Sequence, residues 1–278
     1  MQRWPEFHHE AMATDFAIWI AGHPADYARQ AAAAAWRELD RLESELSRYI
    51  ESSDIGRANR LSPGETIAIG DDALECLLVA AEVCVATNRA FDPAYASERV
   101  GGVPPFTLDP DAHTLTSHAK RLHLDLGAVG KGYALDRLAV VLREWEITSA
   151  LLQSGGSTAL ALASPDDTPG WPVGIGEGTS HHTLTLAHAA LSGSGIAVKG
   201  AHLVNPRTDS TASRHTRVWA LAPTAALSDA LSTAFFVMPD AEIAAFCTAH
   251  PEIGAALDRD GALLAHGTLR PLIAAPTA

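Results

Sequence analysis

Apolar residues recur at intervals of three and four positions in several parts of the chain, the spacing that places them on one face of an α-helix. The longest such stretch begins near Pro24 and carries apolar positions, with charges between them, as far as Tyr49. A second stretch runs from Leu74 to Val85 and ends before Phe91. Further helices are predicted for Leu135 to Leu142, Ala226 to Val237 and Ala241 to His250.

Other segments have the β-branched and aromatic content, and the glycine and proline boundaries, that are typical of strands. One strand is predicted from Ala13 to Ala21, and several antiparallel strands are predicted between Ser149 and Val204. The remaining predicted strands are Arg121 to Asp125, Arg217 to Ala222 and a pair from Gly254 to His266. Because helices and strands come in runs and do not alternate, we expect an α+β fold with antiparallel sheets flanked by helices.

Composition narrows the class of protein. The 278 residues fit one domain or two intimately packed subdomains. The net charge of -13 opposes non-specific binding to nucleic acid or to an anionic membrane. The three cysteines have no metal-site spacing and do not indicate a disulfide framework. We find no signal peptide, lipidation cysteine or apolar run of about 18 residues, so we expect no membrane segment and a cytoplasmic location.

A glycine-rich segment with a lysine is the first candidate site. It sets Asp125, Gly127, Gly130, Lys131 and Gly132 at a predicted junction between a strand and a helix. Glycines allow backbone N–H groups to approach an anion, the following helix supplies its positive N-terminal end, and the lysine adds a full charge. The segment therefore suits a phosphate group, although the same pattern also occurs in plain packing connections.

A carboxylate and a hydroxyl make the second candidate site. Asp229 and Thr233 stand four positions apart in a predicted helix, which places both side chains on one face. Two hard oxygen ligands suit Mg²⁺ or Ca²⁺, and magnesium commonly bridges carboxylates and substrate phosphates. In the alternative interpretation, Ser228 and Asp229 belong to the first turn and cap its free amides. The metal interpretation depends on a phosphate-binding loop nearby.

Several other residues are weaker candidates. His202 could act as a base near neutral pH, whereas Arg207 could clamp a phosphate or pair with a carboxylate to pin its turn. Met12 and Tyr49 could contact a flat ring system, and Phe91-Asp92-Pro93 offers an aromatic ring and a carboxylate before a rigid turn. Each of these is explained as well by packing when it is taken alone.

Taken in order, the motifs resemble those of the ApbE family of FAD:protein FMN transferases. The resemblance extends from about Met12 to Met238. It rests on Met12-Ala13-Thr14, Ser47-Arg48-Tyr49 with Ser53-Asp54-Ile55 and Asn59, Ala90-Phe91-Asp92-Pro93, Asp125 to Ala134, Gly155-Gly156, His202 to Thr208 and Ser228 to Ala234.

The resemblance implies that FAD binds between the two halves of the fold, that Mg²⁺ sits on its pyrophosphate, and that FMN passes to a Thr or Ser hydroxyl of a target protein with release of AMP. The residues implied to contact FAD are Met12, Tyr49, Ala90, Phe91, Asp92, Asp125, Lys131 and Leu203. The implied metal ligands are Asp229, Thr233, the backbone oxygen of Ala128 and Ser232, and the implied catalytic residues are His202, Asp229 and Lys131.

The chain departs from the family pattern at several positions. Ser157 and Asn205 stand where the family usually has other polar residues, Asp209 replaces a common glycine, and the segment from Ser192 to Gly200 is short and rich in glycine. None of these differences falls on Lys131 or on the implied metal ligands. Two other functions stay open at the level of sequence: an FAD pyrophosphatase that releases FMN and AMP, and a protein that stores FAD without turnover.

Overall fold

The computed structural model describes residues 4–166, 168–176, 181–195, 204–208, 210–211, 214–259 and 261–274. At its centre lies an eight-stranded sheet in the order β1-β2-β6-β7-β10-β13-β14-β15, in which every neighbouring pair is antiparallel. These strands are β1 (Glu6–Ala11), β2 (Thr14–Ile20), β6 (Ala150–Ser154), β7 (Thr158–Ala161), β10 (Ala189–Gly195), β13 (Arg217–Ala222), β14 (Gly254–Arg259) and β15 (Ala262–Gly267).

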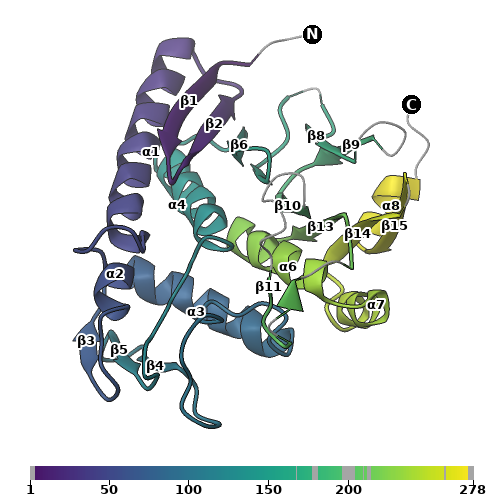
Figure 1. The fold of residues 1–278 in the computed structure, drawn as a ribbon. Coiled ribbons are helices and arrows are strands. Elements are labelled where there is room, and N and C mark those ends of the chain that lie inside the picture. The colour runs from purple at the N-terminus through teal and green to yellow at the C-terminus, as the bar shows by residue number, and fades with distance from the viewer. Residues whose placement is uncertain are drawn as a thin grey trace.

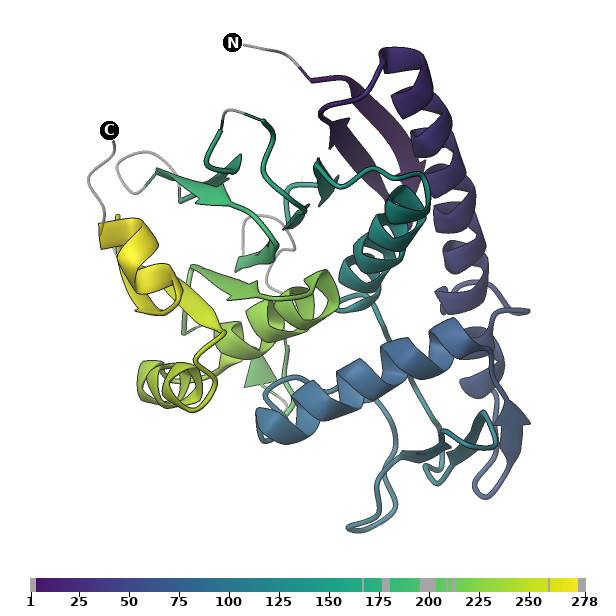
Figure 2. The same cartoon turned by 180° about the vertical axis from the view of Figure 1, so that it is seen from behind.

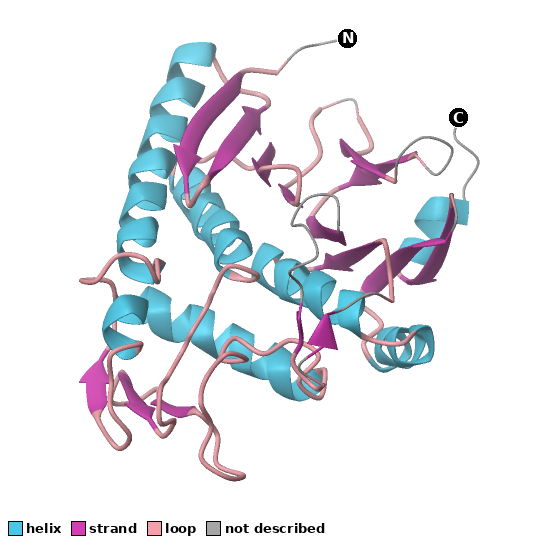
Figure 3. Ribbon diagram, in the orientation of Figure 1, coloured by secondary structure: helices cyan, strands magenta, loops and turns pink. Residues whose placement is uncertain are grey.

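Helices cover one face of this sheet, and a β-hairpin with a short helix covers the other (Figures 1 and 3). The first layer contains α1 (Ala25–Leu46), α4 (Gly130–Glu144) and α6 (Ala225–Val237). The second contains β8 (Trp171–Ile175), β9 (His182–Leu186) and α8 (Leu269–Ala274). The alternation of side chains along a strand explains this division, because Leu152 packs in the helical core while its neighbour Leu151 packs beneath the hairpin.

A further layer lies beyond the helices. Helix α3 (Asp71–Ala86) packs against α6 and α1, and a small sheet in the order β3-β5-β4 lies next to it (Figure 2). The elements here are α2 (Asp54–Ala58), β3 (Thr66–Ala68), β4 (Phe106–Asp109) and β5 (Thr114–Ser117). The remaining described elements are β11 (Val204–Asn205), β12 (Ser210–Thr211) and α7 (Asp240–Ala249).

The predicted α+β class with antiparallel sheets and flanking helices is confirmed. The helical stripes and most of the strands after position 149 are found where the sequence pattern places them. Three groups of strands have no counterpart in the sequence interpretation: β1, whose exposure alternates along Glu6–Ala11, the small sheet β3-β5-β4, and the two-residue pair β11-β12. Their strands are short or lie at an edge, so few apolar residues mark them.

The strand predicted from Arg121 to Asp125 is wrong. This segment is irregular apart from a single bridge between Glu98 and Arg121. Its backbone groups find other partners: the side-chain amide of Asn59 exchanges two hydrogen bonds with Leu124, and the N–H of Asp125 donates to the carbonyl of Pro93 at 2.9 Å. The bend that carries Lys131 is therefore fixed by side-chain and loop contacts and not by a sheet.

Candidate functional site

A cleft with a volume of about 530 Å³ opens where two turns of the large sheet face the helices. Its volume lies in the range of about 300–1,000 Å³ that is usual for small-molecule sites. The walls come from the β1–β2 turn, the end of α1, the bend before α4 and the β6–β7 turn, and consist of Met12, Ala13, Thr14, Glu43, Leu46, Ser47, Arg48, Tyr49, Asp125, Leu126, Gly127, Gly130, Lys131, Gly155, Gly156 and Ser157.

The segment after α1 presents an aromatic ring to the cleft. The helix ends at Leu46, so Tyr49 lies beyond it and is 80% exposed. The guanidinium of Arg48 lies 4.3 Å from the centre of the Tyr49 ring, and its Nε lies 3.4 Å from Oδ2 of Asp125. Such an exposed ring can stack on a planar ligand, and the cation and carboxylate beside it can hydrogen-bond to the polar edge of that ligand.

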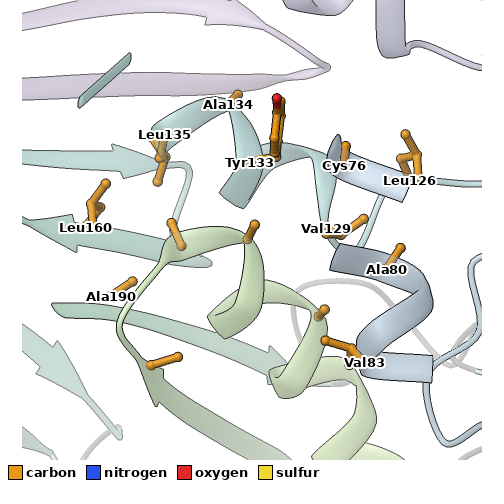
Figure 4. Packing of buried hydrophobic residues seen from close by; sticks show 14 of the residues in the cluster. Cys76, Ala80, Val83, Leu126, Val129, Tyr133, Ala134, Leu135, Leu160 and Ala190 are labelled. Atoms are coloured by element: carbon orange, nitrogen blue, oxygen red, sulfur yellow. The ribbon is translucent and has the colours of Figure 1, made fainter. Parts of the chain in front are cut away.

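The bend before α4 is held by its own carboxylate. Oδ1 of Asp125 accepts the N–H of Gly127 at 2.8 Å, and α4 then begins at Gly130. The bend is anchored in the core by Leu126 and Val129, which belong to the same buried cluster as Cys76 and Ala80 of α3 (Figure 4). The N-terminal end of α4 therefore faces the cleft from a fixed position, which favours an anionic group there.

Lys131 joins this bend to α6. Its Nζ donates to the carbonyl of Gly127 at 2.6 Å and lies 3.5 Å from Oδ2 of Asp229, and its side chain is 15% exposed. The N–H of Gly132 donates to the same carboxylate oxygen at 3.3 Å. The glycine-lysine segment and the predicted metal helix thus meet, although Gly132 and Asp229 are 97 positions apart in the sequence.

The metal candidates on α6 are buried and partly without partners. Asp229 is 2% exposed, and Oγ1 of Thr233 is buried with no hydrogen-bond partner among the described residues. Ser232 is engaged instead, because its Oγ donates to the carbonyl of Asp229 and also contacts Oγ of Ser194 at 2.9 Å. A buried hydroxyl without a partner is unfavourable, so the donor set fits a hard cation at Asp229 and Thr233.

The alternative in which Ser228 and Asp229 cap the helix is wrong. Helix α6 begins at Ala225, so both residues lie beyond its first amides, and the side chain of Thr224 accepts the N–H of Leu227 as the cap. The first two amides of α6, those of Ala225 and Ala226, donate to the two carboxylate oxygens of Asp136 on α4, each at 2.8 Å.

Asp136 and Gly132 fix the contact between α4 and α6. Burial raises the pKa of the Asp136 carboxyl to about 6, although the amides of Ala225 and Ala226 oppose the shift. Gly132 allows the helices to approach, since a Cβ at this position would lie 2.2 Å from the carbonyl oxygen of Ala225. These two residues therefore set the distance between Lys131 and Asp229.

Other predicted site residues lie away from the cleft wall. Ala90 and Phe91 are buried in the core. Asp92 lines a second cavity of about 630 Å³, and its Oδ2 pairs with Arg89 at 3.0 Å and with Arg99 at 2.5 Å. The two cavities adjoin at the hydrogen bond between Asp125 and Pro93 described above. Ala128 lies in the bend, half-buried, and His202 and Leu203 fall outside the described residues.

Arg207 is engaged with its own surroundings. It donates to the carbonyls of Thr87 and Asn88 at the end of α3, and its Nη1 lies 2.8 Å from a carboxylate oxygen of Glu242. This is the pinning role that the sequence left open beside phosphate binding.

Sequence reasoning missed Glu43 and Asp136. Oε1 of Glu43 accepts the N–H of Met12 at 2.9 Å, which ties α1 to the β1–β2 turn. One signal was available for Glu43, because a carboxylate in the last turn of a helix opposes the helix dipole. Within the described residues, no three His, Cys, Asp or Glu side chains gather closely enough to hold a metal, and no helix is long and apolar enough to cross a membrane.

Comparisons with known proteins identify the family of this chain. The sequence model described as ApbE family matches residues 12–257. A protein of Haemophilus influenzae named FAD:protein FMN transferase is 24% identical over 243 residues, which cover 72% of this chain and 70% of that protein. A protein of Escherichia coli K12 with the same name is 28% identical over 131 residues, 42% of this chain and 37% of that protein.

Solved structures share the fold. The flavin transferase ApbE from Vibrio cholerae superposes with a TM-score of 0.84 at 20% identity, covering 97% of this chain and 99% of that one. The apo form of the Pseudomonas stutzeri flavinyl transferase ApbE gives a TM-score of 0.84 at 18% identity, covering 99% and 98%. At these identities the superposition shows the fold.

Proposed function

The chain is a transferase that belongs to the ApbE family, and from this premise we propose that it moves the FMN part of FAD to a Thr or Ser hydroxyl of an acceptor protein, with release of AMP and with the help of Mg²⁺. The observation that carries the proposal is the 3.5 Å approach of Asp229 to Lys131, which lines a cleft together with Met12, Tyr49 and Asp125.

The proposed reaction breaks the phosphoanhydride bond of FAD and forms a phosphate ester with the acceptor. The acceptor hydroxyl oxygen forms a bond to the phosphorus of the FMN half, and the bond from that phosphorus to the bridging oxygen breaks. The hydroxyl proton passes to a base, for which we propose His202, and AMP leaves with the bridging oxygen. Such a reaction asks mainly for positioning and for stabilisation of developing negative charge.

The chain supplies positive charge at two places for this task. Lys131 can turn its ammonium group from the carbonyl of Gly127 to a phosphate oxygen, and the N-terminal amides of α4 face the same region. Tyr49 and Met12 also line the cleft, where a flavin ring can lie against an aromatic and a thioether side chain. Asp125 lines the same cleft, and one of its oxygens already accepts the N–H of Gly127.

The residues on α6 fit a hard divalent cation. Asp229 provides a buried carboxylate and Thr233 a buried hydroxyl that lacks a partner among the described residues, while backbone oxygens of Ala128 and Ser232 are the further ligands that we propose. When bound there, Mg²⁺ would neutralise charge on the diphosphate oxygens. Together with the metal ion, the ammonium of Lys131 would reduce the repulsion between the Asp229 carboxylate and the substrate phosphates.

Incubation of the protein with FAD, MgCl₂ and a candidate acceptor protein tests the proposal. AMP is measured by chromatography and the acceptor by mass spectrometry. We expect an acceptor that gains the mass of FMN in step with AMP release, and neither product when Mg²⁺ is replaced by EDTA. Free FMN with an unmodified acceptor would favour the pyrophosphatase, and tightly bound, unchanged FAD would favour storage; either result would overturn the proposed transfer.

A further inference from the structure

The turn between β1 and β2 holds Met12 at the cleft in a conformation that its residues disfavour. Because Ala11 pairs with Thr14, the loop consists of Met12 and Ala13 alone. Their φ angles are 49° and 57°. Hairpin turns with positive φ at both positions strongly prefer Asn-Gly or Gly-Gly, since a Cβ is unfavourable in the left-handed region. A Met-Ala turn needs outside contacts to hold this shape.

Glu43 of α1 provides one such contact. Its Oε1 accepts the N–H of Met12 at 2.9 Å across 31 positions of sequence. The carboxylate stands in the last turn of α1, where the helix dipole disfavours a negative charge, and within this fully described helix that turn holds no basic residue. An acidic residue at this place is explained by its bond to the turn and not by the stability of its own helix.

The neighbouring turn packs against the same hairpin. The N–H of Gly155 donates to the carbonyl of Asp15 at 2.7 Å, and a Cβ on Gly155 would lie 2.6 Å from Oγ1 of Thr14. The hairpin end is thus braced by the β6–β7 turn, while Glu43 fixes the strained loop itself. Met12, Glu43 and Gly155 all line the cleft.

We propose that Glu43 is a positioning residue for the flavin: it fixes the strained turn so that the Met12 side chain meets the ligand in a preset orientation. The inference rests on the proposed function, in which Met12 contacts FAD. A binding loop that is already ordered loses less conformational entropy when the ligand arrives. Loss of the Glu43 carboxylate therefore weakens FAD binding through Met12, without any contact between Glu43 and the reacting phosphorus.

A double-mutant cycle on FAD affinity tests the inference. FAD is titrated into the parent, Glu43→Ala, Met12→Ala and the double variant without acceptor, and the quenching of flavin fluorescence gives Kd. We expect Glu43→Ala to raise Kd roughly tenfold in the parent and by less than about twofold when Met12 is already alanine. Equal effects of Glu43→Ala in both backgrounds would overturn the inference, because a general structural role does not depend on the Met12 side chain.

Two further variants guard against a trivial loss of folding. Glu43→Gln keeps an oxygen that can accept the N–H of Met12, so its Kd should stay within about twofold of the parent. Glu45→Gln removes another carboxylate from the same part of α1, one that pairs with Arg41 at 2.8 Å, and should leave Kd unchanged. A tenfold loss in Glu45→Gln, or in Glu43→Gln, would also contradict the assigned role.

The failure of this inference is distinguishable from failure of the proposed function. If the parent transfers FMN to an acceptor and the cycle shows no coupling, the function stands and the role of Glu43 falls. If the parent does not bind FAD at all, the proposed function falls and this inference falls with it.

Discussion

At the scale of single residues, the site combines side chains that are satisfied by the protein with a few that are not. Asp125, Lys131 and Ser232 have close partners, whereas Oγ1 of Thr233 has none among the described residues. A buried polar atom without a partner costs about 1–3 kcal/mol. A ligand bound at this face of α6 would give the hydroxyl a partner, since Thr233 stands one helical turn from the buried Asp229.

Replacement of Thr233 by valine separates this role from folding. The substitution keeps the shape of the side chain and removes a hydroxyl that makes no described hydrogen bond, so the melting temperature should hold or rise. Turnover measured with Mg²⁺ should fall by about tenfold or more, because the hydroxyl is assigned to a metal ion that stabilises the transition state. Thr248→Val, which removes a hydroxyl bonded within α7, is the control for turnover. Full activity in Thr233→Val would contradict the assignment.

Asp229→Ala should lower the turnover rate at least about a hundredfold and change the Kd for FAD by no more than a few-fold relative to the parent. The reason is that the carboxylate stabilises the transition state more than it contributes to binding of the flavin ring. The measurements are AMP release and the Kd for FAD. Asp26→Ala, at an exposed carboxylate of α1, is the matched control and should turn over like the parent. Equal rates in Asp229→Ala and the parent would remove Asp229 from the mechanism.

The sequence identifies some of these residues and not others, for a physical reason. Lys131 and Asp229 stand in local patterns, a glycine-rich bend and a helix face, which can be recognised without knowledge of the fold. Glu43 and Asp136 act through backbone groups 31 and 89 positions away, so nothing in their own surroundings reveals the partner. Asp92, which the resemblance implies to contact FAD, pairs with Arg89 and Arg99, and its own local pattern shows neither partner.

At the scale of elements, the contact between α4 and α6 determines the site. Long, periodic helices were predictable because each carries a continuous apolar stripe. The segment from Arg121 to Asp125 was not, since its partners are the side chain of Asn59 and the carbonyl of Pro93. A short apolar run looks the same in a strand and in a buried irregular segment, and only the fold shows which backbone groups it meets.

Gly132→Ala tests the approach of the two helices. A Cβ would lie 2.2 Å from the carbonyl oxygen of Ala225, so α4 must move away from α6. We expect a loss of about 1–3 kcal/mol in the free energy of unfolding, measured with urea, together with a loss of turnover. At Gly102 no described atom lies within 4 Å of such a Cβ, so Gly102→Ala should change neither quantity. A stable, active Gly132→Ala variant would show that the contact is dispensable.

Asp136 gives this contact a pH dependence. Its pKa in the folded state, about 6 because of burial, lies above the value of about 3.9 in an unfolded chain. The folded state therefore holds this proton more tightly, and the contribution to stability is present below about pH 4 and is lost as the pH rises towards 6.

Asp136→Asn cannot ionise and removes that dependence. We expect its melting temperature, relative to that of the parent, to improve as the pH rises from 4 to 6.5, even if the asparagine lowers stability by a constant amount. Thermal melts of both proteins across this range provide the comparison. A difference that stays constant, or that changes in the opposite direction, would show that burial does not govern this carboxyl.

At the scale of the whole molecule, the fold joins three distant parts of the chain at one cleft. The β1–β2 turn with the end of α1, the bend before α4 and the β6–β7 turn line this cleft. Lys131 links it to Asp229 of α6, which lies beside α4 on the same face of the sheet (Figure 1). The antiparallel sheet positions the two turns, and the helices position the charged groups. That FAD binds between two halves of the fold stays a prediction.

A crystal structure of the protein with FAD and Mg²⁺ tests the central claim most directly. The account predicts the diphosphate of FAD beside Nζ of Lys131 and the first amides of α4, with a metal ion bound to the Asp229 carboxylate and to Oγ1 of Thr233. It would be contradicted by a diphosphate bound elsewhere, or by a metal that leaves Asp229 and Thr233 free.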